Sequence, residues 1–138
     1  MDRVIALDVG SKTIGLATGS ILTHLAKPLM TIKRVSVKKD VLRLSMICQQ
    51  QQIDGIVVGL PLMLDGSEGR SARLARQVGD ALGEKLAIEV QYYDERFSSV
   101  SAEEKLKEMG KSYRRRRKEI DQVAAAVILT QWFESLTF

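Results

Sequence analysis

Acidic residues stand at three places where the sequence changes between apolar and polar character. Asp8 lies near the end of the apolar run RVIALDV, Asp94 and Glu95 follow the segment AIEVQYY, and Asp121 precedes the apolar stretch VAAAVIL. A buried ionised carboxylate is costly unless it is paired or coordinates a metal. Carboxylate oxygens suit hard cations such as Mg²⁺. These acids therefore favour a metal site, provided that the fold brings them together.

The other residue types narrow the chemistry of such a site. The sequence holds one histidine, His24, and one cysteine, Cys48, which argues against a zinc cluster and against Ser-His-Asp or Cys-His catalysis. A single cysteine also excludes an internal disulfide and fits a reducing cytosol. The best-fitting reaction is phosphodiester hydrolysis assisted by Mg²⁺ or Mn²⁺, with two ions about 3.5–4 Å apart. For Asp121 alone, a favourable interaction with a helix dipole, about 0.3–1 kcal/mol, is a simpler explanation.

Spacing and composition predict the elements that position these acids. We expect strands at 3–9, 14–19, 28–37, 53–59 and 87–93, and helices at 39–52 and 119–133. Two capping pairs, Asp65 with Glu68 and Ser101 with Glu104, predict the starts of two more helices, the second ending at Gly110. This order predicts a mixed five-stranded sheet with helices on both faces, in one domain spanning 1–138. Parallel strands would bring Asp8 and the Asp94–Glu95 pair to one edge of the sheet.

The basic residues are concentrated more than the net charge of +4 indicates. Six of the eight residues from Lys111 to Lys118 are basic, and four of them are consecutive arginines just before Asp121: Arg114, Arg115, Arg116 and Arg117. We expect this run to be exposed, poorly ordered without substrate, and able to contact nucleic-acid phosphates. A solvated loop that only aids solubility is the alternative. Further candidates for phosphate contacts at the same edge are Lys12, Arg70 and Arg96.

Four segments together resemble the YqgF/RuvX family over essentially the whole chain: ALDVGSKTIGLA, VVGLPLMLDGSEGRSA, YYDERFSS and IDQVAAAVIL. The resemblance implies an RNase H-like α/β fold with strand order 3-2-1-4-5, related to the RuvC Holliday junction resolvases. It implies a cytoplasmic bacterial nuclease that acts in maturation of the 5′ end of pre-16S ribosomal RNA. It also implies that Asp8, Glu95 and Asp121 are the catalytic, metal-binding residues.

One departure from the resolvase pattern affects the choice of acids. RuvC-type resolvases carry an acid after the fourth strand, whereas this chain has Gly59 in the segment VVGLP. The second acid is therefore expected after the fifth strand, two positions and roughly 10 Å from the first strand. Because Glu reaches farther than Asp, we prefer Glu95 to Asp94, which would instead orient Arg96 or cap the following turn.

Three functions remain open at the level of sequence. The first is a nuclease acting on structured RNA such as pre-rRNA, either free or in ribosomal precursor particles. The second is a resolvase of branched DNA, which would need a homodimer, and the third is an RNA-binding assembly factor without turnover. The chain shows no clear dimer stripe, so a monomer and a homodimer both stay possible. No membrane partner is expected, since no apolar segment approaches the roughly 20 residues that span a bilayer.

Overall fold

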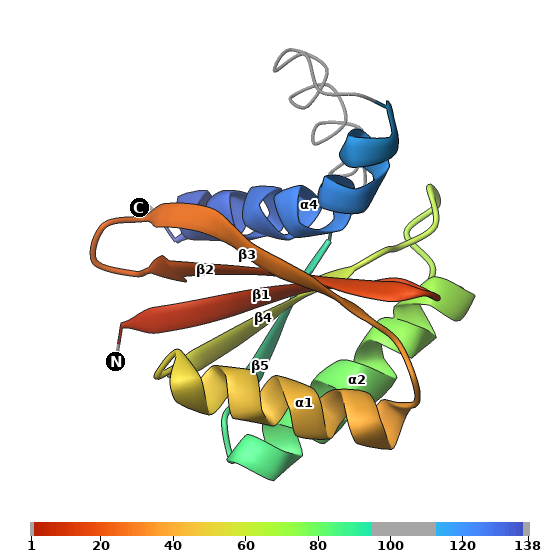
Figure 1. Ribbon diagram of the computed structural model, residues 1–138. Coiled ribbons are helices and arrows are strands. Elements are labelled where there is room, and N and C mark those ends of the chain that lie inside the picture. The colour runs from red at the N-terminus through yellow and green to blue at the C-terminus, as the bar shows by residue number, and fades with distance from the viewer. Residues whose placement is uncertain (1, 95–112, 137–138) are drawn as a thin grey trace.

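The computed structural model describes residues 2–94 and 113–136, with the backbone alone for residues 113–121. One sheet lies between two layers of helices, with α1 and α2 on one face and α4 on the other (Figure 1). The helix expected from Ser101 to Gly110 falls outside the described residues. The elements in chain order are β1 (Arg3–Val9), β2 (Thr13–Ser20), β3 (Leu25–Lys33), α1 (Val37–Gln50), β4 (Gly55–Leu60), α2 (Arg70–Leu86), β5 (Val90–Asp94) and α4 (Tyr113–Ser135).

The five strands follow the order β3-β2-β1-β4-β5, which confirms the expected topology. β1 and β2 form an antiparallel hairpin, and β3 continues it on the outer side of β2. β4 is parallel both to β1 and to β5, because each of these strands is reached through a helical crossover. The strands β1, β4 and β5 therefore end at one edge of the sheet.

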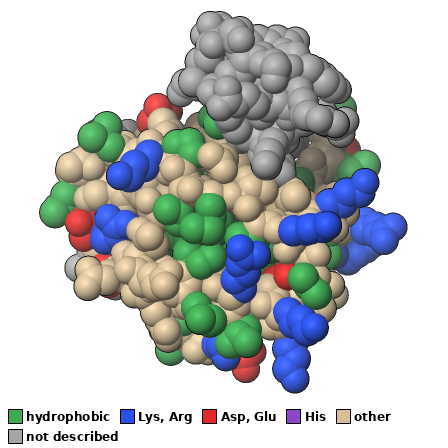
Figure 2. Space-filling view, in the orientation of Figure 1, with side chains coloured by type: hydrophobic (Ala, Val, Ile, Leu, Met, Phe, Trp, Pro, Cys, Tyr) green, Lys and Arg blue, Asp and Glu red, His purple; other side chains and the backbone are tan. Residues whose placement is uncertain are grey.

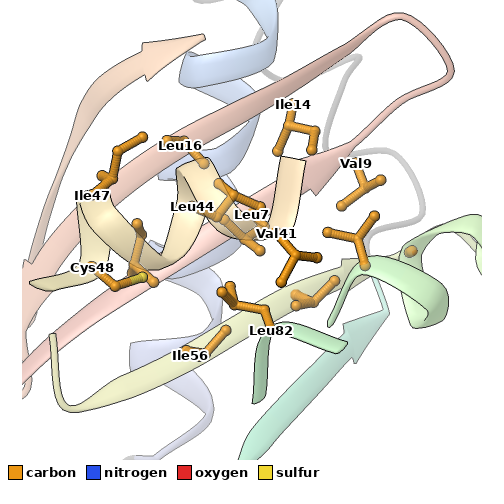
Figure 3. Close-up of a cluster of buried hydrophobic side chains, with 14 of the residues drawn as sticks. Leu7, Val9, Ile14, Leu16, Val41, Leu44, Ile47, Cys48, Ile56 and Leu82 are labelled. Carbon is orange, nitrogen blue, oxygen red and sulfur yellow. The ribbon is translucent and has the colours of Figure 1, made fainter. Parts of the chain in front are cut away.

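Both faces of the sheet are covered, and the alternation of side chains along β1 shows which face each residue takes. Ile5, Leu7 and Val9 belong to the larger cluster beneath α1 and α2, part of which is drawn in Figure 3. Val4 and Ala6 belong to the smaller cluster beneath α4. This double burial explains why β1 is apolar almost without interruption.

Helix α4 packs on the sheet through small and apolar residues, as its sequence predicted. Its buried members are Ala124, Ala125, Ile128, Leu129 and Phe133.

The start of α4 differs from the prediction. The helix begins at Tyr113, six residues earlier than the expected start at residue 119. Its first turns therefore include the whole arginine run, which was expected to form a poorly ordered segment: Arg114, Arg115, Arg116 and Arg117. The helix start was therefore predicted too late, while the exposure of these four side chains and their lack of order without substrate stay a prediction. Arg and Lys have high helix propensity, so a basic run can continue a helix without a break.

The third strand was placed too late in the sequence. β3 ends at Lys33, and the expected strand residues Arg34–Ser36 form the junction to α1. Ser36 caps that helix by accepting a hydrogen bond from the Lys39 backbone N–H at 3.2 Å. The helix therefore starts at Val37, two residues before the expected start, and a side-chain cap explains the difference.

The capping pair predicted before α2 was also wrong. The helix begins at Arg70, and its N-cap residue, Gly69, makes no side-chain capping bond. Asp65 instead accepts hydrogen bonds from the N–H and hydroxyl groups of Ser67 at 2.9 and 2.6 Å. Glu68 pairs with Arg76 at 2.7 Å. Asp65 is thus engaged in a local turn and Glu68 in an ion pair, so neither acid caps the helix.

The remaining strand boundaries differ little from expectation. β2 and β4 agree with the predicted 14–19 and 53–59 to within two residues. β5 starts three residues late, because Ala87 takes a left-handed conformation, with φ 55°, at the end of α2. None of the helices in the described ranges combines the length and hydropathy of a membrane-spanning segment.

Candidate active site

Asp8 is half-buried near the end of β1, on the face covered by α4. Its face follows from alternation along β1, since Val4 and Ala6 pack beneath α4. Asp8 lies opposite Gly15 of β2. On the other side the register pairs Leu7 with Val58 of β4, which brings Gly59 beside Asp8. Neither glycine has a side chain, so the Asp8 carboxylate is flanked by bare backbone on both sides.

Residues paired across adjacent strands form rows that run across the sheet, and helix α4 lies above the row that contains Asp8. The same row continues through Gly15 to Thr31 of β3. The Thr31 hydroxyl donates a hydrogen bond to Gln122 Oε1 of α4 at 3.2 Å. Asp121 directly precedes Gln122 in the helix backbone, and its side chain lies outside the described part of the chain. The helix backbone next to Asp121 therefore meets this row at β3, two strands from β1, and the closeness of Asp121 to Asp8 stays a prediction.

Asp94 ends β5 on the opposite face from Asp8. Tyr92 packs against the cluster beneath α1 and α2, while Tyr93 packs against the cluster beneath α4. Alternation therefore gives Asp94 the face of Tyr92. Asp94 reaches the expected edge, opposite Leu60 of β4, but its side chain does not share the face of Asp8. Glu95 lies outside the described residues, and its role stays a prediction.

Tyr92 holds β5 against α2 on that opposite face. Its hydroxyl donates to the Asp80 carboxylate, and the Arg76 guanidinium lies 4.7 Å from the centre of its ring. Burial, together with the hydrogen bond to Asp80, raises the pKa of Tyr92 far above its ordinary value. The phenol therefore stays protonated at neutral pH and serves as a structural donor.

The turn that follows Asp8 is anchored by a buried ion pair that the sequence analysis did not find. Arg34 donates from Nη1 to the Gly10 carbonyl at 3.1 Å, and its backbone N–H donates to the Lys12 carbonyl at 2.9 Å. Arg34 Nε pairs with Asp40 at 3.1 Å, and the two side chains are only 10% and 3% exposed. Asp40 also accepts the Val35 N–H at 3.0 Å. The sequence signal for this ion pair is weak: an acidic residue, Asp40, follows a few residues after the basic end of a predicted strand.

Basic side chains gather at the edge of the sheet where Asp8 lies. Lys12 is exposed on the β1–β2 turn, and Arg70 is exposed at the first residue of α2. Figure 2 shows several Lys and Arg side chains over the side of the molecule where this turn and the helix starts lie in Figure 1.

The other predicted phosphate contacts are described only in part. Four of them belong to the first turns of α4, although their side chains are not described: Arg114, Arg115, Arg116 and Arg117. Arg96 falls outside the described residues. The contacts of these five side chains with nucleic acid therefore stay a prediction.

The part of the site that the structure describes fits a hard cation. Among the described residues, no three His, Cys, Asp or Glu side chains come together as a metal site. Of the three expected ligands, however, only Asp8 has a described side chain. Asp8 offers carboxylate oxygens, and Mg²⁺ commonly binds through one or two carboxylates while keeping several waters.

Sequence comparison matches nearly the whole chain to known proteins. Residues 2–135 match the family described as "RuvX: Holliday junction resolvase". A protein of Myxococcus xanthus is 41% identical over 133 residues, which cover 96% of this chain and 88% of that protein. A protein of Thermosynechococcus vestitus is 41% identical over 135 residues, which cover 98% of this chain and 89% of that protein. Both proteins are named "Putative pre-16S rRNA nuclease".

Solved structures show the same fold at low sequence identity. T. thermophilus RuvC in complex with a Holliday junction substrate matches with a TM-score of 0.58 and 17% identity, over 98% of this chain and 95% of that chain. The Fowlpox virus resolvase, solved with Holliday junction DNA, matches with a TM-score of 0.57 and 12% identity over the full length of both chains. The fold is therefore the RNase H-like fold of the RuvC resolvases, as the four segments implied.

Proposed function

We propose, from the premise that this chain belongs to the RuvX family, that it is a metal-dependent nuclease acting on pre-16S ribosomal RNA. It would hydrolyse phosphodiester bonds during maturation of the 5′ end. The name shared by relatives 41% identical over nearly the whole chain supports the nuclease activity and the RNA. The observation that carries the proposal is the placement of Asp8, half-buried between two glycines in a row that α4 crosses.

The proposed ligands of Mg²⁺ or Mn²⁺ are Asp8, Glu95 and Asp121. Bound cations would supply Lewis-acid stabilisation of the charge that develops on the phosphate and on the leaving oxygen. Asp8 extends from β1, and Asp121 belongs to the helix that crosses its row. Asp94 lies on the other face of the sheet, which supports the choice of Glu95 as the acid contributed after β5.

The basic residues around this edge would hold the substrate by its backbone. Such contacts position a nucleic acid without reading its sequence. The proposed partner is structured pre-rRNA in the cytoplasm, free or within precursor ribosomal particles. The whole chain, residues 1–138, would act as one nuclease domain, either as a monomer or as a homodimer. The proposed phosphate contacts are Lys12, Arg70, Arg96, Arg114, Arg115, Arg116 and Arg117.

The test compares the proposed ligands with a neighbouring acid as a matched control. We expect a large loss of cleavage in each of three variants: Asp8→Asn, Glu95→Gln and Asp121→Asn. Mutating a residue that only supports a metal ligand costs roughly 10–100-fold in activity, so removing a ligand itself should cost more. Asp94→Asn should keep measurable cleavage. The assay follows end-labelled RNA carrying the 5′ leader of 16S rRNA in Mg²⁺, Mn²⁺ or Ca²⁺, with metal binding measured separately by calorimetry. Full activity of Asp8→Asn, or loss in Asp94→Asn alone, would contradict the assignment.

Thermal melts add a readout that does not depend on activity. If the carboxylates cluster, neutralising one removes like-charge repulsion and should leave metal-free stability unchanged or higher. The stabilisation that added Mg²⁺ gives the wild type should be reduced in the same variants. A large metal-free loss in both Asp8→Asn and Asp121→Asn would show that these acids support the fold instead.

A Holliday junction resolvase is the second candidate, and the description of the matching family favours it. A four-way DNA junction tested beside the RNA decides between the two substrates. Symmetric cleavage of the junction by a homodimer, with no RNA cleavage, would replace the first proposal. Tight RNA binding without cleavage in any metal would instead support an RNA-binding assembly factor.

A further inference from the structure

A polar cavity opens at the same edge of the sheet as Asp8, but on the opposite face. Its volume is about 630 Å³, and it lies between the β1–β2 turn, the junction from β3 to α1, and the first turn of α2. Figure 1 shows these three segments close together at one side of the molecule. Among the described residues, its polar side chains are all hydrogen-bond donors or hydroxyls, and none is acidic: Ser11, Arg34, Ser36, Arg70 and Ser71.

Arg34 is a fixed donor in the wall of this cavity. Its side chain is only 10% exposed, and it is held by Asp40 through Nε and by the Gly10 carbonyl through Nη1. No residue that the structure describes accepts a hydrogen bond from its third nitrogen, Nη2. A donor that is already held in place loses little side-chain entropy when a ligand binds. Asp40 offsets the charge of Arg34, so the net positive charge of the cavity comes from Arg70.

The first turn of α2 adds backbone donors to the same cavity. Gly69 provides no side-chain cap, so the N–H groups at the start of this helix have no side-chain acceptor of the kind that Ser36 gives α1. Uncapped N–H groups and the positive end of the helix dipole favour an anion. Two guanidinium groups, three hydroxyls and these N–H groups together match the several oxygens of a phosphate better than a carboxylate.

We propose that this cavity binds a phosphate of the nucleic-acid backbone other than the phosphate that is cleaved. Val9 lines the cavity, while its neighbour Asp8 faces α4, so a strand crossing this edge of the sheet would meet both sites. The inference rests on the proposed function for the kind of substrate. The ligand assigned is an internal phosphodiester. A terminal phosphate carries similar oxyanions, and the experiment distinguishes the two.

Two pairs of substitutions test the cavity with matched controls. Ser36→Asp places a carboxylate at the cavity, whereas Ser36→Asn does not, and Asp and Asn are equally good N-cap residues. Arg70→Gln removes a lining cation, whereas Arg73→Gln removes an exposed cation of the same helix that does not line the cavity. Binding is measured by fluorescence anisotropy with short 3′-labelled RNA carrying a 5′-hydroxyl or a 5′-phosphate. The buffer contains EDTA and no divalent metal, so cleavage does not enter the measurement.

We expect Ser36→Asp to bind about tenfold more weakly than Ser36→Asn, and Arg70→Gln about tenfold more weakly than Arg73→Gln, on both RNAs. Arg70→Gln should also make the slope of log K against log salt shallower by about 0.7. Equal binding within each pair would overturn the proposal. A loss confined to the 5′-phosphate RNA would overturn the assignment to an internal phosphodiester. Wild-type protein that shows these differences but cleaves no RNA would refute the nuclease function and leave the cavity assigned.

Discussion

The buried pair of Arg34 and Asp40 makes the most direct link between the stability of this fold and the position of its candidate site. Asp40→Ala would leave a guanidinium that is 10% exposed without its counter-charge, and the Val35 N–H without its acceptor. Removing one partner of a buried ion pair costs about 3–5 kcal/mol. A domain of this size has only about 5–15 kcal/mol of net stability, so the variant should be close to unfolding under mild conditions.

Urea unfolding measures this loss, and the chain contains an exposed ion pair for comparison. Glu68 and Arg76 form a salt bridge at 2.7 Å, but their side chains are 38–39% exposed. Glu68→Ala should therefore cost much less than Asp40→Ala, because solvent screens an exposed ion pair. The double variant Arg34→Met with Asp40→Leu should recover much of the single-variant loss, since apolar residues often replace a buried pair at little cost. The reasoning fails if Asp40→Ala costs no more than Glu68→Ala.

The same double variant separates stability from positioning. It would lose the contact between Arg34 Nη1 and the Gly10 carbonyl, two residues after Asp8. If that contact positions the turn, cleavage at saturating RNA should fall even though the protein remains folded. Unchanged cleavage at saturation would show that the pair stabilises the fold without holding Asp8 in place.

Three further predictions address other parts of the molecule. Changing the four arginines of the run Arg114–Arg117 to Gln, which keeps helix propensity, should make the slope of log K against log salt shallower by about 0.7 for each lost single-strand contact; an unchanged slope would leave the run a solubility feature. Gly79→Ala would bring a Cβ within 2.5 Å of the Tyr92 hydroxyl oxygen. The cost of overpacking, about 1–3 kcal/mol, should outweigh the roughly 1 kcal/mol gained in helix propensity. The variant should therefore unfold at lower urea, and a higher urea midpoint would contradict this. Burial raises the pKa of Cys48 to about 12 from an ordinary value of 9.0. The unfolded thiol therefore ionises first, and stability should fall as pH rises above about 9, more in the wild type than in Cys48→Ala.

The arrangement of strands was predictable because hydrophobic patterning repeats over whole elements. The errors lie where one side chain finds a partner that is distant in sequence. Glu68 does not cap a helix because its carboxylate accepts a hydrogen bond from Arg76, eight residues further along the chain. Arg34 was predicted to lie in the third strand, yet it follows that strand and pairs with Asp40 of α1 across the junction. Such contacts depend on the folded arrangement of two elements, so local spacing does not reveal them.

The candidate site shows the same limit in a different form. Because β1 is buried on both faces, its apolar run gives no sign of which face Asp8 takes. The structure supplies that information through register, and it separates Asp8 from Asp94 by the alternation of side chains along β1 and β5. Gly59 holds the place beside Asp8 in the neighbouring strand, so no acid from the end of β4 can occupy this row. Asp94 lies on the other face, so these placements support the proposal that Glu95 and Asp121 complete the site with Asp8.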